Sequence, residues 1–149
     1  GLGLCAGDQK GRSTHLVFQD RGRALWEKAE PHLRNPVRTR NWIKRLRGNR
    51  KALKAGLTAL AENSLVSDDR IPTFAMKAAD FRYQLEKGDV VGCQGPEDAT
   101  EQIEGWFYDP QLLSHGPRVD SLSLYLSLRN THDERVASAV KNLVKGMPW

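Results

Sequence analysis

The sequence predicts an α+β protein, in which a β-hairpin and a helix precede a small mixed α/β domain. Strand-like alternation at residues 14–18 follows a stretch rich in turn residues, as in a hairpin. Apolar residues recur at helical spacing in several later segments. Between residues 71 and 110, short apolar runs alternate with polar and helical ones, which is typical of a mixed sheet. We therefore expect a hairpin-and-helix unit over residues 1–33, a basic connector over 34–54 and the mixed domain over 55–149.

The composition is that of a chain able to build a hydrophobic core. Of its 149 residues, 39% are hydrophobic, which excludes wholesale disorder. No apolar run approaches the roughly 20 residues that a membrane span needs, so we expect no membrane partner. We also expect a cytoplasmic protein, because reduced thiols are the favoured state of its two cysteines. Cys5 and Cys93 lie far apart and lack the spacing of a zinc site. Two reduced thiols are favoured, with one disulfide as the alternative.

Motifs of catalysis and metal binding are missing from the sequence. The four histidines are scattered and form no ligand pattern with cysteines or acids. The sequence contains no phosphate-binding glycine loop and no nucleophile elbow. We therefore expect no metal, no cofactor and no enzymatic activity, with an enzyme of unrecognised type as the remaining alternative.

The opening residues predict a hairpin with a cationic tip. Residues 2–5 and 14–18 are strand-like, and the stretch between them contains two glycines and small polar residues. Lys10 and Arg12 lie at the predicted tip. The chain has no starting Met and opens on strand-like residues, so we expect it to be the later part of a larger protein.

The next two segments predict a helix and then a strongly basic stretch. Asp20 is expected to cap a helix over residues 21–33, in which Pro31 loosens the last turn. Residues 34–54 hold nine Lys/Arg and no acid, and they fit either a linker or a strand with a basic face. Asn49 is expected to cap a further helix over residues 50–64, which has an apolar face.

The remaining residues predict alternating strands and helices. Residues 120–130 set two rules against each other, because alternating leucines favour a strand while Asp120 and the leucines favour a capped helix. Thr131 or Asp133 is expected to begin a final helix that runs to about residue 144. The other expected elements are strands at 71–76, 89–93 and 103–110, a helix at 77–88 that ends on Gly88, and a polar loop at 95–102.

Charge is distributed unevenly along the chain. Residues 1–55 carry a net charge of +10 and residues 56–149 a net charge of −5. This asymmetry favours a basic part that meets nucleic acid or another polyanion, and an acidic part with a different task. The alternative is a basic linker that is merely soluble.

The opening resembles the wing of MarR-type winged-helix regulators. The resemblance rests on Arg12 and Ser13, the apolar run Leu16, Val17 and Phe18, and the helix start Gly22, Arg23, Ala24 and Leu25. It implies that this part is the remnant of a winged helix whose recognition helix precedes the wing, outside this chain. Lys10 and Arg12 would then lie along a phosphate backbone or reach the minor groove.

The later part is similar to the C-terminal domain of AbiEi-type antitoxins. The similar stretches are residues 55–66 followed by IPTFAM, and VDSLSLYLSL followed by residues 133–140. This resemblance implies a helix at residues 120–130. It also implies a domain that acts as the antitoxin or supports the fold.

Together these patterns predict a non-enzymatic, DNA-associated transcriptional regulator, with the antitoxin of a toxin–antitoxin pair as one form of that function. The expected partners are DNA, contacted largely without sequence specificity, and a protein, either a second copy or a toxin. The alternative is a protein-binding module whose basic segment meets an acidic protein. Trp42 is a candidate for stacking on a base, or an anchor of the connector to the domain. The expected nucleic-acid contacts are Lys10 and Arg12 at the tip, with Arg38, Arg40, Lys44, Arg45, Arg47, Arg50 and Lys51 as a basic strip.

Overall fold

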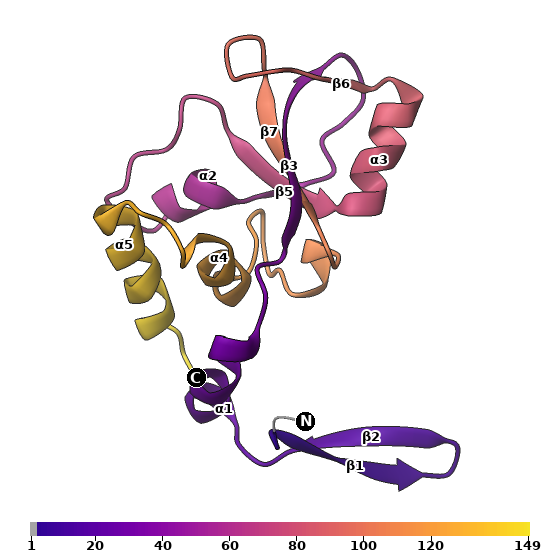
Figure 1. The fold of residues 1–149 in the computed structure, drawn as a ribbon, viewed down its shortest axis with the longest axis vertical. Helices are drawn as coiled ribbons and strands as arrows, with labels where there is room; N and C mark the ends of the chain where they lie inside the picture. The colour runs from indigo at the N-terminus through magenta and orange to yellow at the C-terminus, as the bar shows by residue number, and fades with distance from the viewer. Residues whose placement is uncertain (1–2) are drawn as a thin grey trace. The chain divides into compact units, whose positions relative to one another are not determined.

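The computed structural model describes residues 3–149 and confirms the α+β class. Within these residues it has five α-helices, a two-stranded antiparallel sheet and a five-stranded mixed sheet (Figure 1). The chain divides into two compact units, Gly1–Arg34 with Pro148–Trp149, and Asn35–Met147. Among the described residues, no helix has the length and apolar character that a membrane crossing needs.

The first unit contains the predicted hairpin and helix. Strands β1 (Cys5–Lys10) and β2 (Ser13–Phe18) pair antiparallel. Gly11 turns the chain between them with φ of +64°, a left-handed conformation that costs glycine little. Helix α1 (Gly22–Ala29) follows, and a 3₁₀ turn (Glu30–His32) carries Pro31, so the proline ends the regular helix as expected.

The predicted cap on α1 is wrong. Arg21 occupies the N-cap position and makes no side-chain hydrogen bond to the helix. The Asp20 carboxylate instead accepts a hydrogen bond from Lys28 Nζ at 2.5 Å. Asp20 therefore forms an ion pair with a lysine of α1 and does not accept hydrogen bonds from the amides at the start of the helix.

The second unit is built on the five-stranded sheet, whose strand order is β4-β5-β7-β3-β6. The central strand β7 runs parallel to β5 and antiparallel to β3. Helices α2, α4 and α5 lie on one side of the sheet and α3 lies on the other (Figure 1). The strands are β3 (Val37–Arg45), β4 (Leu53–Lys54), β5 (Thr73–Lys77), β6 (Val90–Gly92) and β7 (Glu101–Trp106), and the helices are α2 (Gly56–Ala61), α3 (Ala78–Lys87), α4 (Ser121–Leu128) and α5 (Glu134–Lys145).

The basic segment 34–54 contains an internal strand of this sheet. Of the two alternatives that the sequence left open, the strand is the one observed, because β3 pairs with β7 on one side and with β6 on the other. The segment is therefore held by backbone hydrogen bonds along much of its length.

The predicted helix over residues 50–64 is too long and begins too early. Leu53 is buried and pairs with Ala75 of β5, so this part of the apolar pattern belongs to a strand. The Ala55 amide donates to the Thr73 carbonyl, and α2 begins only at Gly56, whose φ is +54°. Tertiary pairing overrides helical spacing here, since an apolar side chain every three or four residues also fits a strand followed by a short helix.

The other boundaries follow the sequence more closely. Helix α3 ends on Gly88, which has φ of +75°. Asp120 caps α4 by accepting a hydrogen bond from the Ser123 amide at 2.9 Å, so the helix alternative for residues 120–130 is correct. Asp133 caps α5 in the same way. Strand β7 begins two residues earlier than predicted. It also ends earlier, because Asp109 caps a 3₁₀ turn (Pro110–Leu112).

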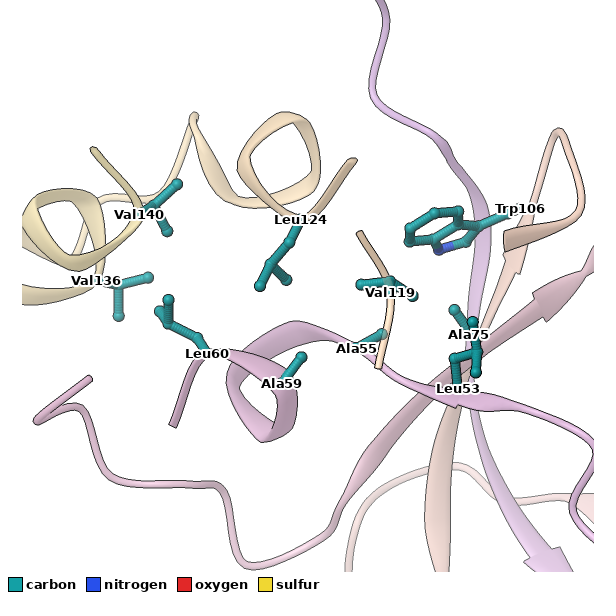
Figure 2. Close-up of a cluster of buried hydrophobic side chains, with 10 residues drawn as sticks. All are labelled: Leu53, Ala55, Ala59, Leu60, Ala75, Trp106, Val119, Leu124, Val136 and Val140. Atoms are coloured by element: carbon teal, nitrogen blue, oxygen red, sulfur yellow. The ribbon is translucent and has the colours of Figure 1, made fainter. Parts of the chain in front are cut away.

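Two hydrophobic clusters pack against opposite faces of the sheet. Alternation along β7 sends Trp106 into one cluster and Ile103 into the other. The first cluster joins the sheet to α2, α4 and α5 (Figure 2): Leu53, Ala55, Ala59, Leu60, Ala75, Trp106, Val119, Leu124, Val136 and Val140. The second lies on the side of α3: Ile43, Phe74, Met76, Phe81, Val90 and Ile103.

Candidate nucleic-acid interface

Alternation along β3 places two cations and an aromatic ring in one row. Successive side chains of a strand point to opposite faces, so Arg40, Trp42 and Lys44 share one face while Ile43 and Arg45 share the other. We call Arg40, Trp42 and Lys44 the β3 row. The Arg40 side chain is 46% exposed and Lys44 is exposed. This arrangement of a ring between two cations suits a nucleic acid strand, whose phosphates and bases alternate.

Trp42 is partly buried and belongs to neither hydrophobic cluster of the described residues. Its neighbour Ile43, on the opposite face, is fully buried in the second cluster. The sequence offered two roles for Trp42, stacking or anchoring. By register Trp42 shares its sheet face with Glu104 and Trp106, and its position outside both clusters leaves the indole partly exposed.

Two arginines of the predicted basic strip, one half-buried and one exposed, pair with a buried acid. Glu101 is fully buried, and Arg45 Nη2 lies 2.7 Å from its Oε1 while Arg50 Nη2 lies 2.5 Å from its Oε2. Burial opposes ionisation of Glu101, but hydrogen bonds from Arg50 and Arg45 outweigh it and lower the pKa of this carboxyl. The Arg50 guanidinium also lies 4.0 Å from the ring centroid of Phe74. These two arginines hold the fold together at this end of the sheet.

The remaining members of the basic strip lie at the surface with different partners. Arg47 donates to Asp89 at 2.9 Å and to the Lys87 carbonyl at 2.6 Å, and its hydrogen bond lowers the pKa of Asp89. The Arg38 guanidinium lies 5.9 Å from the ring centroid of Phe107. In the described part of the chain, Lys44 and Lys51 are exposed and form no ion pair. The predicted strip therefore separates into structural arginines and available cations.

A second buried acid lies beside the β3 row, on the neighbouring strand β7 and on the same face of the sheet. Glu104 is paired with Arg40 in the register of β7 and β3, and its exposed fraction is 1%. Arg40 Nη2 is 3.6 Å from Glu104 Oε2, close enough for charge attraction and too long for a hydrogen bond. Neither carboxyl oxygen has a hydrogen-bond partner, and the indole nitrogen of Trp106 also lacks one. Burial raises the pKa of Glu104, and the charge on Arg40 only partly opposes this.

Neither buried glutamate was predicted as a functional or structural residue. The signal was present in the strand sequence EQIEGW, where acids occupy positions of a strand that is internal to the sheet. An acid on each face of a central strand must find a cation or lose its charge. The excess of arginines in residues 34–54 indicates where such cations could come from.

The hairpin tip carries the other predicted contacts. Arg12 is exposed in the turn between β1 and β2. Lys10 ends β1, and its side chain lies outside the described part of the structure. Strand β2 exposes three large apolar residues, Leu16, Val17 and Phe18, at 64%, 54% and 48%. A hairpin with exposed apolar side chains can meet a partner as well as a phosphate backbone.

Other candidate sites are less informative. A groove of about 830 Å³ lies between α5 and the residues after α2, with Leu57, Val66, Val136 and Leu143 among its apolar lining. In residues 3–149 no group of three or more His, Cys, Asp or Glu residues is placed to hold a metal ion. Cys5 and Cys93 are free thiols, which is the alternative favoured by the sequence.

No family model, curated protein or solved structure matches this chain. The two family resemblances therefore remain expectations drawn from the residues that carry them. The features that bear on function are the β3 row and the cationic tip of the hairpin.

Proposed function

We propose that this chain is a DNA-associated protein that acts by binding, as a transcriptional regulator or as the antitoxin of a toxin–antitoxin pair. The observation that carries the proposal is the β3 row, in which an accessible indole lies between Arg40 and Lys44 on one face of an internal strand. Strand β7 pairs with β3 along residues 37–43 and β6 pairs with residues 43–45, so backbone pairing supports the row, on both sides at its Lys44 end.

The charge of the surrounding segment supports the same proposal. Lys44 and Lys51 are exposed cations without an ion pair in the described residues, so they can neutralise phosphates at no cost in internal contacts. Arg12 at the hairpin tip adds a cation of the kind that contacts a phosphate backbone. Phosphate contacts position a protein without reading sequence, so the expected affinity is largely nonspecific.

The test is fluorescence anisotropy of a labelled random duplex, titrated with the chain from about 50 to about 200 mM salt. We expect log affinity to fall linearly with log salt, with a slope of about −0.9 for each phosphate neutralised. A double variant, Lys44→Glu with Lys51→Glu, should bind at least about tenfold more weakly. Its salt slope should be smaller by about two contacts.

The matched control is Lys141→Glu with Lys145→Glu, which makes the same change in net charge on exposed residues of α5. This control should retain most of the affinity. Equal losses in both variants would mean that overall charge, and not the β3 segment, attracts the duplex. No binding by the unmodified chain at low salt would overturn the proposal.

A second candidate function is a protein-binding module, and one observation favours it. Leu16, Val17 and Phe18 are exposed on β2, where a water-facing strand would ordinarily carry polar residues. If duplex binding is absent, the triple variant with Ser at these positions should abolish association with a protein partner or a second copy. Light scattering of the chain over a range of concentrations would detect self-association directly.

A further inference from the structure

We propose that nucleic-acid binding at the β3 row is coupled to protonation of Glu104, so that the protein takes up a proton when a phosphate pairs with Arg40. This inference rests on the proposed function, because it concerns how binding at that same site is regulated. It makes Glu104 a positioning residue that acts through Arg40 and does not itself touch the ligand.

The geometry gives Arg40 two competing partners. Its guanidinium lies 3.6 Å from the Glu104 carboxyl on the inner side, while 46% of its side chain is open to solvent on the outer side. No hydrogen bond joins the two groups, so Arg40 can turn toward a phosphate without breaking one. A phosphate on the outer side would satisfy the arginine with charge-assisted hydrogen bonds that Glu104 does not supply.

Arg40 is also the cation on which the charge of Glu104 depends. No second ion pair to Glu104 exists among residues 3–149. In the described part of the chain, Arg40 is the one charged side chain that acts on the pKa of this carboxyl. Its other neighbours do not titrate: Ala75 pairs with it on β5, and a Cβ at Gly56, at the start of α2, would lie 3.6 Å from its Oε1. Trp106 brings an indole, which does not titrate.

These contacts link the two equilibria. A charged phosphate beside Arg40 offsets the attraction that keeps the buried carboxylate ionised, so binding favours the protonated form of Glu104. By reciprocity, protonating Glu104 leaves the charge of Arg40 uncompensated and strengthens phosphate binding. Burial already raises the pKa of Glu104 above its ordinary value, which brings this exchange toward neutral pH.

The first measurement uses the unmodified chain with a random duplex of fixed length. Isothermal titration calorimetry in two buffers of different ionisation enthalpy gives the number of protons taken up on binding. We expect uptake of a fraction of one proton, falling to zero as pH drops below the raised pKa of Glu104, where the carboxyl is protonated before binding. Binding without proton uptake across the range of about pH 5 to about pH 8 would overturn the inference.

The second measurement compares variants by anisotropy over the same pH range. Wild-type affinity should weaken as pH rises, by at most about tenfold per pH unit for one linked proton. Glu104→Gln should bind at least as tightly as wild type at the acidic end and lose this part of the pH dependence. Lys44→Ala is the matched control, because it should weaken binding at every pH and leave the slope unchanged.

The outcomes separate the inference from the function on which it rests. Glu104→Gln changes no other ionisable side chain, so the difference between the two profiles isolates Glu104. Salt-dependent binding with the same pH profile in both proteins would retain the function and overturn the coupling. Absence of duplex binding in wild type at every pH would overturn both.

Discussion

Two buried glutamates of the same strand differ in their partners and in the direction in which their pKa values are shifted. Glu101 and Glu104 lie three residues apart on β7, on opposite faces of the sheet, and their exposed fractions are 0% and 1%. Glu101 is bound by two arginines through both of its oxygens, whereas Glu104 has one arginine at 3.6 Å and no hydrogen bond. Both side chains are shielded from solvent, but Glu104 lies deeper in the fold and has the weaker partners, so depth and partners together push the two pKa values in opposite directions.

The difference follows from position along the strand. Glu101 begins β7, where Arg45 ends β3 and Arg50 follows it in the chain, so two flexible side chains can reach it. Glu104 lies within β7, between Arg40 on β3 and Ala75 on β5. A mid-strand acid meets only what its neighbouring strands place beside it.

The two acids therefore contribute to stability with opposite dependence on pH. The pKa of Glu101 is lowered in the folded chain, so the stability that it provides is present at neutral pH and is lost as pH falls through that lowered value. The pKa of Glu104 is raised in the folded chain. The unfolded chain then releases this proton first, and stability declines as pH rises from the ordinary glutamate value toward the raised one.

The largest expected effect is that of Glu101→Ala. This change leaves the buried Arg45 without its counter-ion, and we expect the free energy of unfolding to fall by about 3 kcal/mol. Urea denaturation at neutral pH measures the loss. Arg47→Ala, which removes a surface ion pair with Asp89, is the control and should cost much less than Glu101→Ala. A loss below about 1 kcal/mol for Glu101→Ala would contradict the structural role given to this cluster.

A smaller effect of opposite sign is expected for Glu104→Gln. Replacing an acid that resists ionisation by a neutral amide of the same shape should stabilise the fold at about pH 8, by on the order of 1 kcal/mol. The two proteins should become equally stable near pH 4, because wild-type Glu104 is then protonated in both folded and unfolded chains. Thermal unfolding across this pH range tests the prediction. A variant that is less stable than wild type at alkaline pH would show that the Arg40 ion pair stabilises the fold.

The smallest effect is expected for Arg40→Ala. The Arg40 side chain is 46% exposed and makes no hydrogen bond to Glu104, which can take up a proton when it loses this cation. At about pH 5, where that proton costs little, removal of Arg40 should change the free energy of unfolding by about 0.5 kcal/mol. Arg45→Ala, measured in the same urea series, should cost several times more because the Arg45 side chain is only 13% exposed. Similar losses of unfolding free energy in the two arginine variants would show that Glu101 and Glu104 depend equally on their arginine partners.

Local signals predicted much of the fold. The hairpin, the Gly88 end of α3 and the Asp120 and Asp133 caps all depend on residues within a few positions of one another. The predicted helix over residues 50–64 is wrong because a distant strand competes with local spacing, and the Asp20 cap is wrong because a side chain of the same helix competes with its amides. Leu53 pairs with β5, and Asp20 binds Lys28 instead of the helix amides.

The candidate site was predicted in composition and not in arrangement. The sequence identified the cations of residues 34–54 and Trp42 as a group, and alternation along a strand would have placed Arg40, Trp42 and Lys44 together. It did not indicate that Arg45 and Arg50 neutralise Glu101, which lies more than fifty residues later in the chain. Such pairing depends on which strands become neighbours, and spacing within one segment carries no information about it.

The sequence by itself determined the α+β class, the turn chemistry and the concentration of positive charge near β3, because these follow from short-range periodicity and composition. The tertiary structure alone decided that β7 lies between β5 and β3, and thereby which acid each arginine meets. The physical reason is that an ionisable side chain responds to its neighbours within a few ångströms, and a sheet takes those neighbours from distant parts of the chain. Glu101 consequently stays charged and stabilises the fold through two arginines, whereas Glu104 lies beside Arg40, the proposed phosphate contact.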